Sequence, residues 1–227
     1  DTEVYPTSKM VPGRPFPPHG IVSLRQPVAL RSAMRSDGLN VTELLQESDH
    51  RFVSPVRLRP EPLRGLAEPY AITLDFGPLE VERPLVLGIT AWLRFGGGLA
   101  NVAGSLDPEL PFPFPTLEVE VSPGIFEPVD VVVGTPAGKT KRMVVDLDGK
   151  LPAGSRRLRL ATAYELHWDQ IVLLEKADPA ESRITHLEPD VAELYWRGFS
   201  DFADLPWYRP LTPVFDQVRP KIGRAHV

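Results

Sequence analysis

The feature that most constrains the fold of this chain is an alternation of apolar and polar residues with a period of two. It is clearest along Arg156–Trp168, where the even-numbered residues are mostly apolar and the odd-numbered residues are mostly charged, small or polar. Successive side chains of a β-strand lie on opposite faces, so this period is typical of a half-buried strand. The pattern predicts one central strand with Leu158 and Trp168 in the core and His167 on the solvent face.

Further runs with the same period predict the remaining strands. About seven or eight strands at such spacings, with no helical period between them, favour an antiparallel two-sheet sandwich of the jelly-roll or galactose-binding-like kind. The 26 prolines suit turns and strand edges and do not suit long helices. Besides Leu158–Trp168, the predicted strands are Tyr70–Phe76, Leu85–Phe95, Leu117–Val121, Val129–Val133, Met143–Leu147 and Ala192–Trp196.

One short helix is predicted near residues 41–48. Asn40 is a good N-cap residue and Glu43 completes a pattern like a capping box, while Val41, Leu44 and Leu45 share one face. The long connection Gly96–Pro115 contains a glycine run but no lysine and no good helix pattern after it. It therefore predicts a flexible loop at the end of the sandwich and not a phosphate-binding loop.

These elements predict four regions along the chain. Residues 1–66 form an N-terminal segment that wraps the sandwich and carries the short helix, residues 67–200 form the β-sandwich, and residues 201–221 are irregular. The last residues, KIGRAHV, match the translation of a common sequencing adapter. We therefore expect residues 222–227 to be a non-native tail on a fragment of a longer protein.

The sequence contains no recognisable catalytic, cofactor-binding or metal-binding signature, and we predict a protein that is not an enzyme. It has no cysteine, no nucleophile elbow and no pair of histidines at metal-ligand spacing. Glu118 and Glu120 share one strand face, as the carboxylates of a glycosidase could, although alternating glutamates are also what a solvated strand face contains.

Aromatic residues are the best candidates for ligand binding, namely Trp92, Phe95, Trp168 and Tyr195. Trp92 lies on the opposite strand face from the apolar residues around it, where an exposed ring could stack on a sugar. The alternative is that residues 1–66 or Phe199–Phe215 cover the same rings and bury them. The even-numbered position of Trp168 favours packing in the core.

Charge and hydropathy limit the classes of partner. The net charge of −5 argues against nucleic acid as a partner. No apolar run approaches the roughly 20 residues that a membrane-spanning helix needs. Other domains of the same chain, protein partners or glycans remain as candidates.

Several phrases resemble the C-terminal part of large bacterial proteins that combine FG-GAP-type propeller repeats, an ASPIC/UnbV-like module and tetratricopeptide repeats. The similar phrases are DTEVYPTSKM (1–10), DGLNVTELLQESDHRFV (37–53), LRGLAEPYAITLDFGPL (63–79), GKLPAGSRRLRLATAYELHWDQIVL (149–173) and LYWRGFSDF (194–202). The resemblance implies an exported accessory β module of the periplasm, cell envelope or extracellular space, with no catalytic residues to transfer. The predicted function is a non-catalytic structural or interaction module, with carbohydrate binding as the alternative and hydrolysis as a further one.

Overall fold

The computed structural model describes residues 3–6, 21–108, 114–136, 140–177, 190–196, 198–205 and 212–219. The predicted tail at 222–227 and the proline-rich stretch Val11–Gly20 lie outside these residues. The chain divides into two compact units, Asp1–Ser182 and Arg183–Val227.

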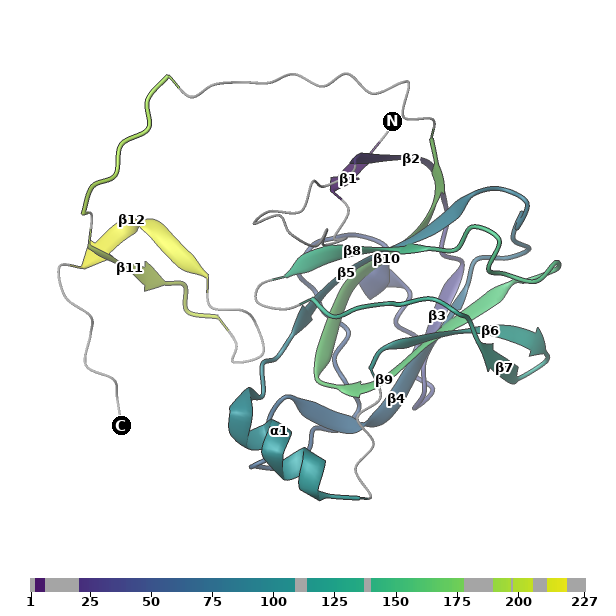
Figure 1. The fold of residues 1–227 in the computed structure, drawn as a ribbon, viewed down its shortest axis with the longest axis horizontal. Coiled ribbons are helices and arrows are strands. Elements are labelled where there is room, and N and C mark those ends of the chain that lie inside the picture. The colour runs from purple at the N-terminus through teal and green to yellow at the C-terminus, as the bar shows by residue number, and fades with distance from the viewer. Residues whose placement is uncertain are drawn as a thin grey trace, which may run out of the picture. The chain divides into compact units, whose positions relative to one another are not determined.

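The first unit contains two five-stranded antiparallel sheets (Figure 1). We call them sheet A, with the strand order β1-β2-β10-β5-β8, and sheet B, with the order β3-β4-β9-β6-β7. The strands of sheet A are β1 (Glu3–Pro6), β2 (Ile21–Val28), β10 (Leu166–Lys176), β5 (Leu85–Leu93) and β8 (Lys141–Asp146). Those of sheet B are β3 (Ser32–Arg35), β4 (Leu66–Asp75), β9 (Arg157–Tyr164), β6 (Thr116–Ser122) and β7 (Ile125–Pro128).

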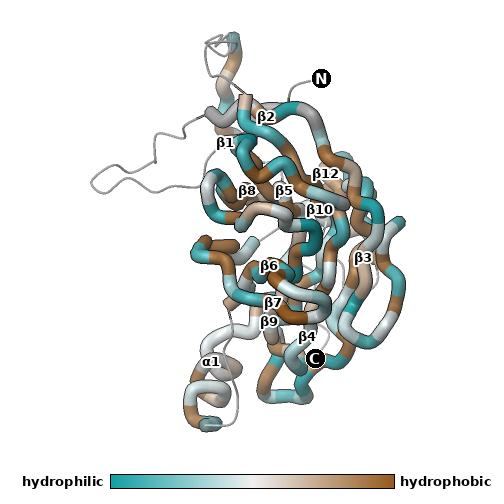
Figure 2. Tube along the Cα trace, turned by 90° about the vertical axis from the view of Figure 1, so that its right-hand side faces the viewer, coloured by the Kyte–Doolittle hydropathy of each residue, from teal (hydrophilic) through white to brown (hydrophobic). Residues whose placement is uncertain are grey.

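One hydrophobic core joins the two sheets, which makes this unit a β-sandwich. Leu87 and Ile89 of sheet A are fully buried in the same cluster as Ile72, Leu158 and Leu160 of sheet B. Hydrophobic and hydrophilic residues alternate along β6 and β9 of sheet B (Figure 2), whereas β5 of sheet A is buried at almost every position. The predicted antiparallel sandwich is therefore confirmed, as are the strands that we expected around residues 70–76, 85–95, 117–121 and 143–147.

The predicted central strand Leu158–Trp168 is two strands that belong to different sheets. β9 ends at Tyr164, β10 begins at Leu166, and Glu165 is the single residue between them. The Glu165 N–H donates to the Gly65 carbonyl (2.9 Å), and its own carbonyl accepts from the Arg94 N–H (3.0 Å). Glu165 thus joins the start of β4 in sheet B to the end of β5 in sheet A, and we call this junction the Glu165 corner.

Two glycines let the chain segments approach each other at the Glu165 corner. Gly65 has a φ of +84°, and a Cβ on it would lie 2.7 Å from the Arg94 carbonyl oxygen. A Cβ on Gly96 would lie far inside van der Waals contact with the Arg64 carbonyl oxygen. Only glycine fits where two backbones come this close.

The short helix predicted near residues 41–48 is reduced to one 3₁₀ turn, η1 (Glu43–Leu45). The Asn40 side chain accepts hydrogen bonds from the Thr42 N–H and hydroxyl and so forms a local turn instead of an N-cap. Beyond η1, the Asp169 carboxylate accepts hydrogen bonds from the Ser48 hydroxyl and the His50 N–H. These tertiary contacts outweigh the helix propensity of a segment that is too short to be helical on its own.

The predicted flexible loop after Gly96 contains an α-helix, α1 (Gly97–Leu106), with Gly96 at its N-cap. Ala100 is buried on one side of the helix, while Val102 and Leu106 are exposed. The leucines and alanines of this run are good helix formers. The glycines that weaken the helix pattern lie mostly at its start, where the close contact with residue 64 requires Gly96.

Two further strand predictions are wrong. Residues 129–133 form no strand: the Val131 N–H donates to the Val129 carbonyl (2.8 Å), which makes a tight turn in place of a strand pairing. Residues 192–196 also form no strand. The second unit instead pairs β11 (Phe199–Phe202) with β12 (Pro213–Arg219) in a separate two-stranded sheet, so residues 201–221 are not wholly irregular.

Substituting Gly96 tests the backbone approach at the Glu165 corner. We expect Gly96→Ala to lower the free energy of unfolding by about 2 kcal/mol or more, because backbone would have to move. Gly98→Ala is the matched control: a Cβ there meets nothing within 4 Å, so Ala should stabilise the helix by roughly 0.5–1 kcal/mol. Urea unfolding of both variants measures the difference, and equal stabilities would contradict the close packing.

Candidate functional site

A buried chain of hydrogen bonds begins at the Glu165 corner. Glu165 and His167 are almost fully buried, and the His167 Nε2 lies 3.3 Å from a Glu165 carboxylate oxygen. On the other side of the ring, Nδ1 lies 3.0 Å from the hydroxyl of the half-buried Ser54. A carboxylate at Nε2 assigns the ring proton to that nitrogen, so Nδ1 accepts a hydrogen bond from Ser54.

Aromatic rings enclose His167. Trp92 stacks on the imidazole with ring centroids 4.9 Å apart, and Phe52 meets it edge-on at 6.4 Å. The prediction that His167 is a surface residue is therefore wrong, since its exposed fraction is 1%. The alternation correctly placed His167 on the outer face of sheet A. It could not indicate that Phe52 and Ser54, more than 110 residues earlier, cover that face.

The covering segment, residues 46–54, is held against β10 by both backbone and side chains. Val53 and Trp168 exchange two backbone hydrogen bonds of 2.7 and 3.0 Å. The fully buried Asp169 accepts from the Ser48 hydroxyl (2.8 Å) and the His50 N–H (2.7 Å). A buried carboxylate needs such donors, so segment 46–54 is a built part of the fold.

Ser54, His167 and Glu165 have the connectivity of a nucleophile, a base and a carboxylate that orients the base. No sequence motif pointed to this set, because its members come from segments far apart in the chain. Two features oppose catalysis here. The imidazole is enclosed by Trp92 and Phe52, and the Ser54 carbonyl accepts a 2.8 Å hydrogen bond from Arg35, which fixes the backbone beside the hydroxyl.

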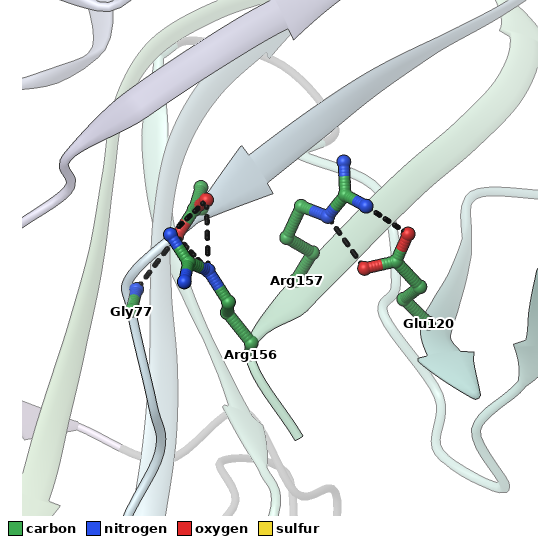
Figure 3. A network of polar contacts seen from close by, with 5 residues as sticks. Gly77, Glu120, Arg156 and Arg157 are labelled. Atoms are coloured by element: carbon green, nitrogen blue, oxygen red, sulfur yellow. Dashed lines mark hydrogen bonds and ion pairs between the residues drawn. The ribbon is translucent and has the colours of Figure 1, made fainter. Parts of the chain in front are cut away.

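The two glutamates that could have been glycosidase carboxylates are paired with arginines on the outer face of sheet B. Glu118 lies directly opposite Arg159 in the β6–β9 register and forms an ion pair with it, and Glu120 pairs with Arg157. Figure 3 shows Arg157 and Glu120 beside a second cluster, in which Arg156 contacts Asp75. Arg159 also lies over the Phe126 ring, 4.2 Å from its centroid. We call these cross-strand Glu–Arg ion pairs the ion-pair ladder. Such pairs are typical of a solvated strand face, so they favour a structural role for the two glutamates over a catalytic one.

A small pocket of about 190 Å³ opens at the Glu165 corner, on the end of the sandwich beside α1. The Gly65–Gly96 approach forms part of its wall, and Tyr164, the last residue of β9, also lines it. Phe95 and Phe114 line it too and are exposed, with the Phe114 and Tyr164 rings 5.7 Å apart. Burial raises the pKa of the Tyr164 phenol above its ordinary value, so this hydroxyl is neutral near pH 7.

The four aromatic residues predicted as ligand-binding candidates have different surroundings. Trp92 is 8% exposed and stacks on His167, so its ring is buried and not presented to a ligand. Trp168 is fully buried, and its indole N–H donates to the Tyr70 hydroxyl at 3.1 Å. Phe95 lies at the pocket, and Tyr195 is an exposed residue of the second unit. Of the four, Phe95 is the one that combines an exposed ring with a pocket.

The described part of the chain shows neither a candidate metal site nor a candidate membrane-spanning helix. No group of three or more His, Asp or Glu side chains is arranged to hold a metal ion there. Among the same residues, no helix has the length and hydropathy needed to cross a bilayer.

The Glu120 ion pair in the ion-pair ladder makes the free energy of unfolding depend on pH. Burial opposes ionisation, but the Gly124 N–H (2.8 Å) and the Arg157 guanidinium outweigh it and hold the pKa of Glu120 below its usual value. A lowered folded-state pKa contributes stability above the unfolded pKa of about 4.3, and this contribution is lost as pH falls through the folded value.

We therefore expect Glu120→Gln to reduce the loss of stability between about pH 5 and pH 3. Urea unfolding at a series of pH values measures this slope. Glu127→Gln on β7 is the charge-matched control and should leave the slope as in the wild type. The same slope in wild type and Glu120→Gln would show that the ion pair does not form in solution.

No model of a protein family matches the chain, and a search of curated proteins found no match. The resemblance to the FG-GAP and ASPIC/UnbV-containing proteins therefore stays a prediction, and the function has to be argued from the geometry.

Proposed function

We propose that this chain is a non-catalytic interaction module of a larger exported bacterial repeat protein. Support comes from how the polar and aromatic side chains are distributed. Glu118, Glu120 and Asp169 are engaged by partners within the fold, and so is the Glu165–His167 pair. The second unit, by contrast, presents large apolar side chains to solvent.

The observation that carries this proposal is the aromatic surface of the second unit. Tyr195 and Trp196 are 71% and 73% exposed, and Phe202 and Phe215 of the two-stranded sheet are also exposed. A two-stranded sheet alone is marginally stable at best. Exposed apolar groups of this size mark a surface that is buried by a partner, and in a repeat protein neighbouring domains supply one.

Hydroxyl-radical footprinting tests the interaction. We expect Tyr195 and Trp196 to be oxidised readily in this chain and at least fivefold more slowly in a longer form of the protein that includes its neighbouring domains. The reason is that burial excludes the radical from the rings. Trp168, which is fully buried in the core, is the internal control and should react slowly in both forms. Equal oxidation of Tyr195 and Trp196 in the two forms would contradict the proposal.

The non-catalytic part of the proposal is tested at Ser54. A fluorophosphonate probe labels serines that a neighbouring base activates. We expect no labelling above the level of a Ser54→Ala variant, because Trp92 and Phe52 enclose the imidazole and Arg35 holds the backbone beside the hydroxyl. Intact-mass analysis measures the adduct. Labelling of the wild type that disappears in both Ser54→Ala and His167→Gln would establish a hydrolase-like centre instead.

Carbohydrate binding is the second candidate function, and the pocket at the Glu165 corner favours it. Phe95, Phe114 and Tyr164 offer aromatic surface around a concave site at the end of a β-sandwich. Sugar rings have apolar faces that pack on such surfaces. Retention of the chain in a glycan-containing gel, and its loss on Phe95→Ala, tests this candidate.

A further inference from the structure

The segment that contacts the outer face of β10, residues 46–54, buries little apolar surface of its own. Residues 46–51 are all exposed, and Val53 is the one member of the segment that lies in the hydrophobic core. Hydrogen bonds therefore supply most of the attachment of this segment to β10. Chain segments with few buried apolar contacts open locally, at a lower free energy than the core does.

The backbone of His50 makes the closed position of this segment strained. Its φ is +65°, in the left-handed region that residues other than glycine rarely adopt. Such a conformation persists only where the surrounding structure holds it. Here the His50 N–H donates a hydrogen bond of 2.7 Å to the Asp169 carboxylate. The strain and the contact that holds it therefore lie at the same peptide unit.

Asp169 lies at an irregularity in β10. The register between β10 and β5 shifts between Trp168 and Gln170, so Asp169 is the extra residue of a bulge. A bulge turns a side chain in a direction that a regular strand does not allow. The buried carboxylate accepts from the Ser48 hydroxyl (2.8 Å) as well as from the His50 N–H. One side chain of the central strand thus holds the segment at two points.

We propose that residues 46–54 form a strap that opens on its own while the sandwich stays folded, and that Asp169 is the latch of this strap. The strained backbone at His50 favours the open state, and the charge-assisted hydrogen bonds to the carboxylate favour the closed one. The proposal does not depend on the interaction surface proposed above, which lies in the second unit.

Opening of the strap exposes His167. In the closed state the Ser54 hydroxyl contacts the imidazole Nδ1, and the Phe52 ring meets the imidazole edge-on. Both contacts are lost when the strap leaves β10. The strap thus controls whether solvent and partners reach an imidazole that stacks on Trp92.

The test is native-state hydrogen exchange followed by NMR in low concentrations of urea. The Val53 and Trp168 N–H groups each donate to the carbonyl of the other residue, and the His50 N–H donates to Asp169. We expect these three amides to exchange with little dependence on urea, because a local opening exposes little surface. The amides that pair β5 with β10 should exchange with the steep urea dependence of global unfolding.

Asp169→Asn tests the latch. It should speed exchange of the His50 and Val53 amides roughly tenfold or more, since charge-assisted hydrogen bonds are lost. Ser48→Ala removes one donor at an exposed position and should give a smaller increase, which decides the matter if Asp169→Asn does not fold. Asp130→Asn is the charge-matched control, because its carboxylate is fully exposed after β7. It should leave exchange as in the wild type.

Diethyl pyrocarbonate, which acylates accessible neutral imidazoles, gives a second readout by mass spectrometry. We expect slow modification of His167 in the wild type and faster modification in Asp169→Asn, in proportion to the exchange of Val53. His50 is exposed and should react rapidly in every variant, as the internal control.

Two results would overturn the proposal. If the His50 and Val53 amides have the urea dependence of the β5–β10 amides, the strap opens only when the whole unit unfolds. If exchange and modification in Asp169→Asn and Ser48→Ala equal those of the wild type, Asp169 does not hold the strap.

Discussion

The fold depends on a chain reversal at a single residue. Glu165 lies between β9 and β10, and its two backbone hydrogen bonds connect Gly65, just before β4 of sheet B, to Arg94, just after β5 of sheet A. β9 and β10 are the middle strands of sheet B and sheet A. Two consecutive strands therefore form the centre of both layers. At this end of the sandwich, the single residue between them sets the distance between the layers. The glycines at 65 and 96 are needed because the same junction brings two other backbones into contact.

The corner also places two different environments back to back. On one side, the Glu165 side chain meets His167, which in turn contacts Ser54, and the Phe52 and Trp92 rings flank this hydrogen-bonded cluster. On the other, the backbone at 94–97 opens into a pocket with arginines and aromatic rings. Buried carboxylates such as those of Glu165 and Asp169 are costly unless they are fully paired. The partners of Asp169 in segment 46–54 are Ser48 and His50, and they specify where that segment lies, which a purely apolar contact would leave less well defined.

The sequence predicts what depends on local periodicity and fails where contacts between distant residues decide. Leu158, Leu160 and Trp168 are in the core as their alternation indicates, and both sheets form. The period of two continues through Glu165, however, because a tight turn between two strands need not interrupt it, and the pattern therefore predicts one strand where the structure has two. The helix expected after Asn40 was displaced by hydrogen bonds to Asp169, far along the chain. Of the four aromatic ligand candidates, Phe95 alone lies at the pocket, and the arginines beside it carried no local signal.

The position of β9 and β10 at the centre of both sheets has a consequence for how the chain acquires its structure. In sheet A, β2 and β5 both pair with β10, and in sheet B, β4 and β6 both pair with β9. A ribosome or a secretion channel delivers the N-terminal strands first, and they have to wait for residues 157–176 before either layer can close. Folding dominated by such distant pairings is slow, and the waiting strands have open edges that invite association. Acquisition of structure in this protein is thus timed by the arrival of one twenty-residue stretch, and chaperones would be needed most just before it emerges.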